Sequence, residues 1–179
     1  MIAAITCARM GSTRFHGKCL ATLGGQPLLQ YTVDFALALG LQLYVWTRDQ
    51  EILDFASDKC PVIYEPKWLY DTDYNSTFEK MRYANEIIQA DFLVLLQPTH
   101  PMRSLPAVRA WLAALSEPET DYARSVILGT EESSGSFYAY SRHYLQTRFM
   151  RRERLCYENR PYDIDTPTDL ERCEACLRA

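Results

Sequence analysis

The chain has 179 residues, of which 47% are hydrophobic and 23% charged, as in an ordinary globular protein, and we expect one domain spanning 1–179. Its net charge of −4 argues against nucleic acid as the main partner, because a phosphate backbone calls for a basic surface. No apolar run reaches the length of a membrane span, and no basic region precedes the apolar N-terminus, so we expect no membrane partner, no signal peptide and a cytoplasmic location with reduced cysteines.

Short apolar runs alternate with segments of helical periodicity. In chain order, the pattern predicts a strand at 1–8, helix at 27–39, strand at 41–47, helix at 50–57, strand at 62–64, helix at 77–89, strand at 92–97, helix at 105–115, and strands at 122–128 and 136–140. Such repeated strand–helix–strand units predict an α/β fold, with a mostly parallel sheet and helices on both faces. Because ligands of these sheets bind at the carboxyl ends of the strands, the segments that follow the strands are the candidate sites.

The segment RMGSTRFHGK, residues 9–18, directly follows the first predicted strand. Glycines let backbone N–H groups approach a phosphate, and the cationic side chains neutralise its charge. The segment is not a Walker A loop, because five residues instead of four separate Gly11 from Gly17, and Cys19 follows Lys18. An exposed basic turn is the alternative interpretation. The phosphate-binding candidates are Arg9, Gly11, Ser12, Arg14 and Lys18.

A second segment, QPTHPMR, follows the strand at 92–97. Gln97 offers both a donor and an acceptor to a polyhydroxyl ligand, and Arg103 is able to pair with a carboxylate through two parallel hydrogen bonds. Both residues are therefore candidates for substrate binding. The alternative is a proline-stiffened turn with Arg103 at a helix start. We expect His100 to make a structural hydrogen bond rather than to serve as a base.

The third segment carries Asp163 and Asp165 shortly before a predicted helix. In a strand, residues two apart face the same way with Cα atoms roughly 6.5–7 Å apart, so we expect these two carboxylates to hold one hard cation together. Magnesium prefers such oxygen ligands, with waters and substrate phosphates completing its shell. Thr166, Pro167 and Asp169 form the signature of a helix N-terminus, in which Asp169 is the capping partner.

Together the three segments resemble the cytidylyltransferases that activate acidic sugars, among them the CMP-N-acetylneuraminate and CMP-Kdo synthetases and the spore-coat-polysaccharide cytidylyltransferases. Arg9, Ser12, Arg14 and Lys18 match the family pattern R-x-x-S-x-R-x-x-x-K. QPTHPMR resembles its QPTSPLR, DIDTPTDL its D-I-D-T-x-x-D-L, and SFYAYSR its G-x-x-Y-x-F strand. The resemblance touches both ends and the middle of the chain, in family order.

This resemblance implies a Rossmann-like fold of the nucleotide-diphospho-sugar transferase type and the transfer of CMP from CTP to an acidic sugar, with release of pyrophosphate. Lys18, Arg9, Asp163 and Asp165 are then the expected catalytic residues, and the two aspartates are the expected Mg²⁺ ligands. Asn75 and Ser76 are expected to approach the nucleotide, and Gln97 and Arg103 the acceptor. A carboxylated sugar of the 2-keto-3-deoxy type, such as a nonulosonic acid, is the expected acceptor.

The chain departs from the family pattern at His16, Cys19 and Glu65, and the last of these stands where the sialic-acid enzymes often carry arginine near the nucleotide. The loop GTEESSGS is short where relatives insert an excursion that often builds a dimer, so we expect a monomer or a weak homodimer. Two alternatives stay open: a nucleotidyltransferase acting on another small acid or a phosphonate, and a non-catalytic nucleotide-binding module.

Overall fold

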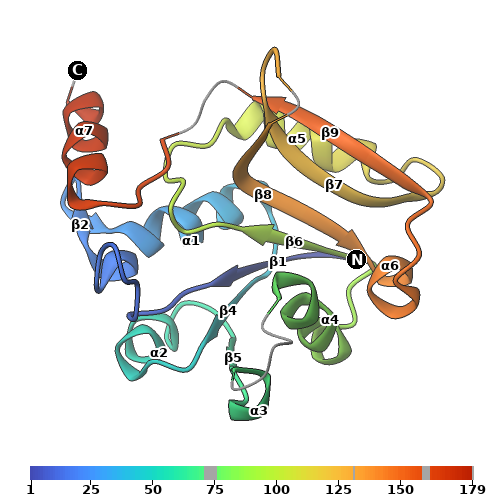
Figure 1. Cartoon of the computed structure of the whole chain (residues 1–179), viewed down its shortest axis with the longest axis horizontal. Coiled ribbons are helices and arrows are strands. Elements are labelled where there is room, and N and C mark those ends of the chain that lie inside the picture. The colour runs from blue at the N-terminus through green and yellow to red at the C-terminus, as the bar shows by residue number, and fades with distance from the viewer. Residues whose placement is uncertain (71–75, 131, 159–161, 179) are drawn as a thin grey trace.

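A seven-stranded sheet with the order β5-β4-β1-β6-β8-β7-β9 forms the centre of the fold (Figure 1). The computed structural model describes residues 1–70, 76–130, 132–158 and 162–178. The strands of this sheet are β1 (Ile2–Cys7), β4 (Leu43–Thr47), β5 (Val62–Tyr64), β6 (Phe92–Leu96), β7 (Thr120–Ile127), β8 (Ser133–Ser141) and β9 (Arg152–Glu158).

The sheet is mostly parallel, as predicted. Strand β1 pairs in parallel with β4 and β6, β4 pairs in parallel with β5, and β7 with β9. Strand β8 runs antiparallel to both of its neighbours, β6 and β7. The carboxyl ends of β1, β4, β5 and β6 therefore meet at one edge, where the sequence predicts the ligand site.

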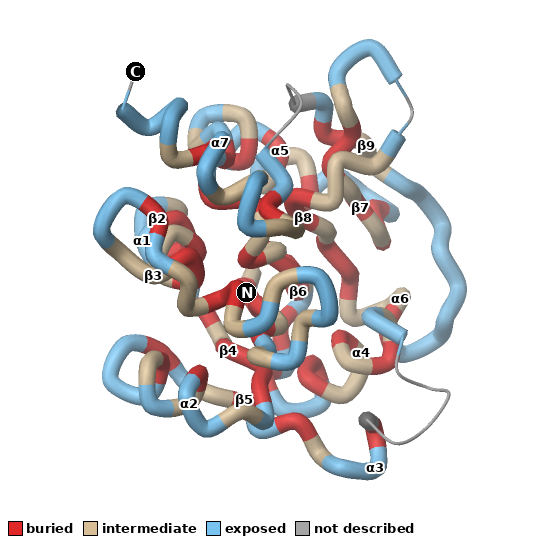
Figure 2. Tube along the Cα trace, turned by 60° about the vertical axis from the view of Figure 1, so that its left-hand side comes forward, coloured by how far each residue is buried: buried red, intermediate tan, exposed pale blue. Residues whose placement is uncertain are grey.

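Helices cover both faces of the sheet, because alternate residues of each buried strand enter different cores. On one face, α1 (Leu28–Leu39), α2 (Gln50–Ala56) and α5 (Leu105–Ala114) pack over Ala4 and Val94. On the other, α3 (Lys67–Tyr70), α4 (Thr77–Ile88) and α6 (Arg142–Thr147) pack over Ile5 and Leu95. Figure 2 shows the result, with buried strands between helices whose outer turns are exposed.

A third, smaller core joins the beginning of the chain to its end. Two of its buried members come from the hairpin of β2 (Thr22–Leu23) and β3 (Gln26–Pro27): Leu23 lies in β2, and Leu28 directly follows β3. The others are Ile164, in the segment before α7 (Pro167–Leu177), and Cys173, within that helix. Figure 1 shows β2 and α7 together beyond the end of β1. This core holds the first loop and the segment with the two aspartates at the same end of the sheet.

Helix α7 begins where the sequence predicts. Thr166 is its N-cap and Pro167 its first residue, and the Asp169 side chain completes a capping box by accepting from the Thr166 backbone N–H at 2.8 Å. Pro27, by contrast, is the N-cap of α1 and lies outside the first helical turn in which it was predicted.

The elements that were not predicted are the short helix η1 (Lys18–Leu20), the β2–β3 hairpin, α3, α6 and β9. Strand β9 has the sequence RERLCYE, whose charged residues conceal the apolar alternation of a strand. It forms the edge of the sheet beside β7, where charged side chains are able to face water. Within the described ranges, no helix has the combination of length and apolar character that crossing a membrane requires.

Candidate functional site

A cavity of about 280 Å³ opens at the carboxyl ends of β1, β4, β5 and β6, beside the N-terminus of α4. Its lining residues are Cys7, Ala8, Arg9, Trp46, Glu65, Thr77, Lys80, Leu95 and Gln97. Burial raises the pKa of the Cys7 thiol to about 12, so this group is a protonated wall residue and not a nucleophile. Of the predicted site residues, Arg9 and Gln97 meet here.

The first loop leaves this cavity at Arg9, which is exposed, and is shaped by its own backbone. The Ser12 and Gly17 N–H groups both donate to the Met10 carbonyl, at 2.8 and 2.9 Å, and the Met10 N–H donates to Asp49 Oδ2 at 2.6 Å. Gly17 has a φ of 69°, a left-handed conformation that favours glycine, and it leads directly into the short helix η1 (Lys18–Leu20). The loop thus returns to bring Lys18 inside the fold, where this residue is 9% exposed.

Two cations of this loop converge on one carboxylate from the far end of the chain. Lys18 Nζ lies 2.8 Å from Asp165 Oδ1, and Arg14 contacts Asp165 Oδ2 at 2.8 Å. The Asp165 side chain is 25% exposed, so this cluster faces solvent on one side. The predicted phosphate-binding loop and the predicted metal-binding segment therefore form one charged centre.

Asp163 and Asp165 flank Ile164, which is fully buried, and so both carboxylates point away from the small core. The Ile164 N–H donates to the Thr99 carbonyl at 2.9 Å, but residues 162–165 do not form a strand, the geometry from which the shared orientation of the two aspartates was expected. The segment therefore meets the loop after β6 through this backbone contact.

The donor set at this centre suits a magnesium ion better than a metal that needs an all-protein cage. Asp163 is about half exposed, and its Oδ1 lies 3.8 Å from His100 Nδ1. Over the described part of the chain, no group of three or more histidine, cysteine, aspartate or glutamate side chains is placed to bind a metal. Asp163 and Asp165 offer two carboxylates, which is a number that Mg²⁺ uses when substrate phosphates and waters supply its remaining ligands.

His100 supports the structure, as the sequence suggested. Its ring is 2% exposed; Nε2 donates to the Ser134 carbonyl at 3.0 Å, and Nδ1 therefore accepts from the Thr99 hydroxyl at 2.9 Å. Burial lowers the pKa of His100 to about 4, so the ring is neutral near pH 7. It fixes the loop whose Thr99 carbonyl holds Ile164 between the two aspartates.

Arg103 lies inside the fold rather than in the cavity. It is 8% exposed, its Nε donates to the Ser136 carbonyl at 3.3 Å, and another guanidinium nitrogen donates to the Gln97 carbonyl. Its guanidinium carbon lies 5.5 Å from the centre of the Phe35 ring. This placement favours a structural role, at the point where β6 ends beside β8, over the predicted contact with an acceptor carboxylate, which stays a prediction.

The two residues predicted to approach the base have different outcomes. Asn75 lies outside the described residues. Ser76 is the N-cap of α4, and its hydroxyl accepts from the Glu79 N–H at 3.3 Å, so the structure accounts for it as a helix cap.

Sequence reasoning missed a charged pair in the wall of the cavity. Glu65 Oε1 lies 2.8 Å from Lys80 Nζ, and Glu65 is 7% exposed. Glu65 was noted only as a departure from the family pattern, and Lys80 was not singled out at all. The available signal was the position of Glu65, directly after a predicted strand end.

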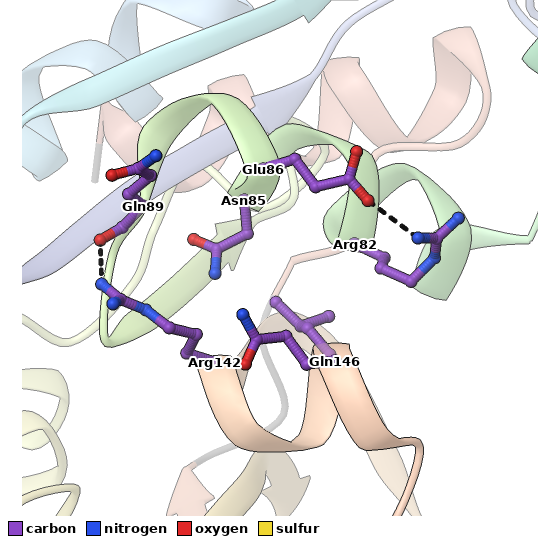
Figure 3. A pocket seen from close by; sticks show the side chains of 7 residues that line it. Arg82, Asn85, Glu86, Gln89, Arg142 and Gln146 are labelled. Atoms are coloured by element: carbon purple, nitrogen blue, oxygen red, sulfur yellow. Dashed lines mark hydrogen bonds and ion pairs between the residues drawn. The ribbon is translucent and has the colours of Figure 1, made fainter.

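Another hollow, of about 550 Å³, lies between α4 and α6 beside the amino end of β6 (Figure 3). Its charged groups have partners: Arg82 contacts Glu86 within the lining at 2.8 Å, and Arg142 contacts Asp91, which lies outside the lining, at 3.1 Å. Asn85 bonds both the N–H and the carbonyl of Ala90. These contacts explain the polar lining as structural.

Comparison with known proteins connects this geometry to a family. The family model described as Cytidylyltransferase matches residues 3–134. Among curated proteins, the 3-deoxy-manno-octulosonate cytidylyltransferase of Acidobacterium capsulatum is 32% identical over 114 residues, which are 62% of this chain and 44% of that protein. These alignments cover more than half of this chain but less than half the length of each curated relative.

Solved structures share the fold over nearly the whole chain. CMP:2-keto-3-deoxy-manno-octonic acid synthetase complexed with CTP has a TM-score of 0.82 at 18% identity, covering 99% of this chain and 98% of that one. Rv0371C from Mycobacterium tuberculosis H37Rv in complex with manganese has a TM-score of 0.71 at 19% identity, covering 97% and 98%. At these identities the likeness establishes the fold, and the predicted nucleotidyltransferase architecture is confirmed.

Proposed function

Because the chain belongs to the cytidylyltransferase family, we propose that it transfers CMP from CTP to an acidic sugar and releases pyrophosphate. The observation that carries the proposal is the contact of Lys18 with Asp165, which joins the two charged motifs beside a cavity at the strand ends. The curated relatives named for octulosonate cytidylyltransferase activity support the same chemistry.

In this proposal the first loop binds the triphosphate. Nucleotidyl transfer depends mainly on positioning the phosphates and on stabilising the charge that develops on them. When CTP binds, Lys18 and Arg14 move from the Asp165 carboxylate to phosphate oxygens of CTP. The exchange is possible because the carboxylate and the phosphates are both anionic. Arg9, at the mouth of the cavity, neutralises charge on the departing pyrophosphate.

Asp163 and Asp165 are the residues that would hold Mg²⁺, and their number and oxygen chemistry fit that ion. A divalent cation held by these carboxylates would supply Lewis-acid polarisation of the α-phosphate of the nucleotide. The manganese complex of a protein with the same fold supports a divalent ion in this type of domain. His100 and Thr99 position the segment by holding Ile164 between the two carboxylates.

We propose a 2-keto-3-deoxy sugar acid as the acceptor, attacking the α-phosphate through its anomeric hydroxyl. The relatives found by comparison are named for eight-carbon octulosonates, which shifts the expectation from nonulosonic acids toward these shorter acids. Gln97 is the proposed contact for the acceptor, because its amide is both donor and acceptor and its side chain reaches the cavity.

A monomer or a weak homodimer remains our proposal for the assembly. The turn between β7 and β8 is short, with the Ile127 N–H bonded to the Glu132 carbonyl at 3.0 Å, so no long excursion is available there to build an interface. Light scattering at several concentrations tests this; a dimer that persists at the lowest concentration contradicts it.

A pyrophosphate-release screen of the four nucleoside triphosphates against a panel of acidic sugars tests the proposed function. We expect release that requires both CTP and a 2-keto-3-deoxy acid. Release that is independent of any acceptor, or that occurs only with a phosphonate or a neutral sugar phosphate, contradicts the acceptor assignment. Absence of release with every pair contradicts the transferase assignment.

A further inference from the structure

The buried pair Glu65–Lys80 has no role in the phosphate chemistry described above, yet it forms part of the wall of the 280 Å³ cavity. We propose that this pair reads the base of the nucleotide, with Glu65 accepting a hydrogen bond from the exocyclic amine of cytosine and Lys80 donating to the neighbouring ring acceptors. The inference rests on the proposed function and deepens it by assigning the residues that determine base specificity.

Glu65 is held rigidly enough for such a role. It directly follows β5 and precedes Pro66, and its N–H donates to the Thr47 carbonyl at 2.7 Å, which extends the β4–β5 pairing by one residue. The Glu65 side chain is 8% exposed and that of Lys80 is 17% exposed, so little solvent screens either charge. A buried carboxylate keeps its position only where a partner compensates the loss of water, and Lys80 on α4 is that partner.

The pair also retains capacity for a ligand. A carboxylate has about four lone-pair sites and an ammonium group has three N–H donors, and their mutual contact uses only part of each. Both residues line the cavity, so the remaining acceptor and donor capacity is available there. The wall thus presents an acceptor beside a donor to any group that enters.

The rest of the cavity suits a flat ring. Ala8, Trp46 and Leu95 provide apolar wall, and Arg9 lies where the first loop with its cationic groups begins. The volume of about 280 Å³ lies just below the usual range for pockets that bind small molecules, roughly 300–1,000 Å³, and so favours a single ring over a whole nucleotide. A base in this cavity places its phosphates toward Arg9 and Lys18.

The chemistry of the pair discriminates between pyrimidines. Cytosine carries an amino group, a hydrogen-bond donor that Glu and Asp side chains recognise, where the thymine ring and likewise uracil carry a carbonyl acceptor. A uracil carbonyl in that position would face the Glu65 carboxylate. Both groups are hydrogen-bond acceptors, so no hydrogen bond forms between them. Sites of this kind reject the wrong ligand strongly, because buried polar groups lose their partners.

The test compares the Glu65→Gln variant with the unaltered chain, using the ratio of kcat/KM for CTP to that for UTP. A glutamine amide is able to donate as well as accept, so we expect this ratio to fall at least tenfold. Glu51→Gln, an exposed change on α2, is the matched control and should leave the ratio unchanged. If the CTP-to-UTP ratio of the Glu65→Gln variant stays within twofold of the original, the inference is overturned. This holds also when the activities with CTP and with UTP fall together through loss of stability.

Binding of CMP and UMP, measured by titration calorimetry on the full chain, separates this inference from the proposed function. Preferential binding of CMP that Glu65→Gln reduces supports the inference even if no acceptor is ever turned over. Equal binding of CMP and UMP by the unaltered chain, or binding of neither, overturns it. A chain that transfers CMP normally but shows no effect of Glu65→Gln leaves the transferase assignment intact and refutes the assignment of the base-reading pair.

Discussion

Asp165 Oδ1 lies 2.8 Å from Lys18 Nζ, although 147 positions separate the two residues in the sequence. The small core around Leu23, Ile164 and Cys173 makes this contact possible, because it packs the helix α7 against the hairpin that follows Lys18. The contact links a loop that suits phosphate to a carboxylate that suits a divalent cation. The predictions below test whether this centre works as a catalytic unit.

Replacing Lys18 with methionine should lower kcat/KM for CTP at least tenfold, a loss of about 1.4 kcal/mol or more in transition-state stabilisation. The reason is the removal of a positive charge from the proposed triphosphate site. The KM of the acceptor should change little. Initial rates with each substrate varied in turn measure both effects. Lys59→Met, on the exposed surface after α2, is the control; equal effects of the two changes contradict the role of Lys18.

Replacing Asp165 with asparagine should reduce turnover at least a hundredfold, because it removes the proposed carboxylate ligand of a cation that contributes several kcal/mol to charge stabilisation. Asp163→Asn should act similarly. Asp169→Asn is the matched control: it weakens the cap of α7, at a cost of roughly 0.5–2 kcal/mol in the free energy of unfolding, but should preserve dependence on a divalent cation. Titration of activity with Mg²⁺ and with a chelator measures this dependence, and full activity in the chelator argues against it.

Most of the fold was predictable because local pattern and tertiary structure agree. Strands such as β6, apolar throughout, and the capped start of α7 follow directly from the sequence. Strand β9 could not be found this way, because an edge strand with four charged residues among seven lacks the apolar signal of a buried strand. Its place beside β7 depends on contacts between distant segments.

The sequence motifs of the site were predictable, but the contacts between their residues were less so. Lys18, Arg14 and Asp165 were each identified, but their convergence depends on the small core of the hairpin and α7. The sequence also gave no means of telling that Arg103 is buried against backbone carbonyls, or that Lys80 faces Glu65, since both facts depend on packing between separate elements.

Replacing Arg103 with alanine should lower the free energy of unfolding by about 2–4 kcal/mol, because the buried carbonyls of Gln97 and Ser136 lose a charged donor. Catalytic parameters for CTP and for the acceptor should then decline together. Chemical denaturation and steady-state kinetics on the same preparation measure the two effects. If the KM for the acceptor rises tenfold or more without loss of stability, the result supports the direct contact between Arg103 and the acceptor carboxylate that the sequence suggested.

Asp121 should make folding stability depend on acid pH. This residue is fully buried and accepts hydrogen bonds from Arg151 and Ser141, which hold the pKa of its carboxyl well below the usual range. The folded chain therefore binds a proton less readily than the unfolded chain, whose aspartates titrate near about 3.9. The stabilisation is fully present above that pH and declines as the pH falls below it.

The variant Asp121→Asn tests this assignment. It should lower the free energy of unfolding at pH 7 by roughly 1–3 kcal/mol, since the charged acceptor for Arg151 is lost. Denaturation curves recorded at pH 7 and at pH 3 should show the gap between variant and original narrowing in acid. A gap that is constant across this range shows that the Asp121 charge does not carry the stabilisation.

The fate of the α-phosphorus of CTP tests the proposed transfer most directly. CTP carrying a radiolabel at the α-phosphorus is incubated with the full chain, Mg²⁺ and 3-deoxy-manno-octulosonate, and the products are separated. We predict label in a CMP-sugar, unlabelled pyrophosphate in equal amount, and loss of both products when Asp165 is replaced with asparagine. Label that stays in CTP, or that appears only as free CMP with no sugar adduct, would contradict the account.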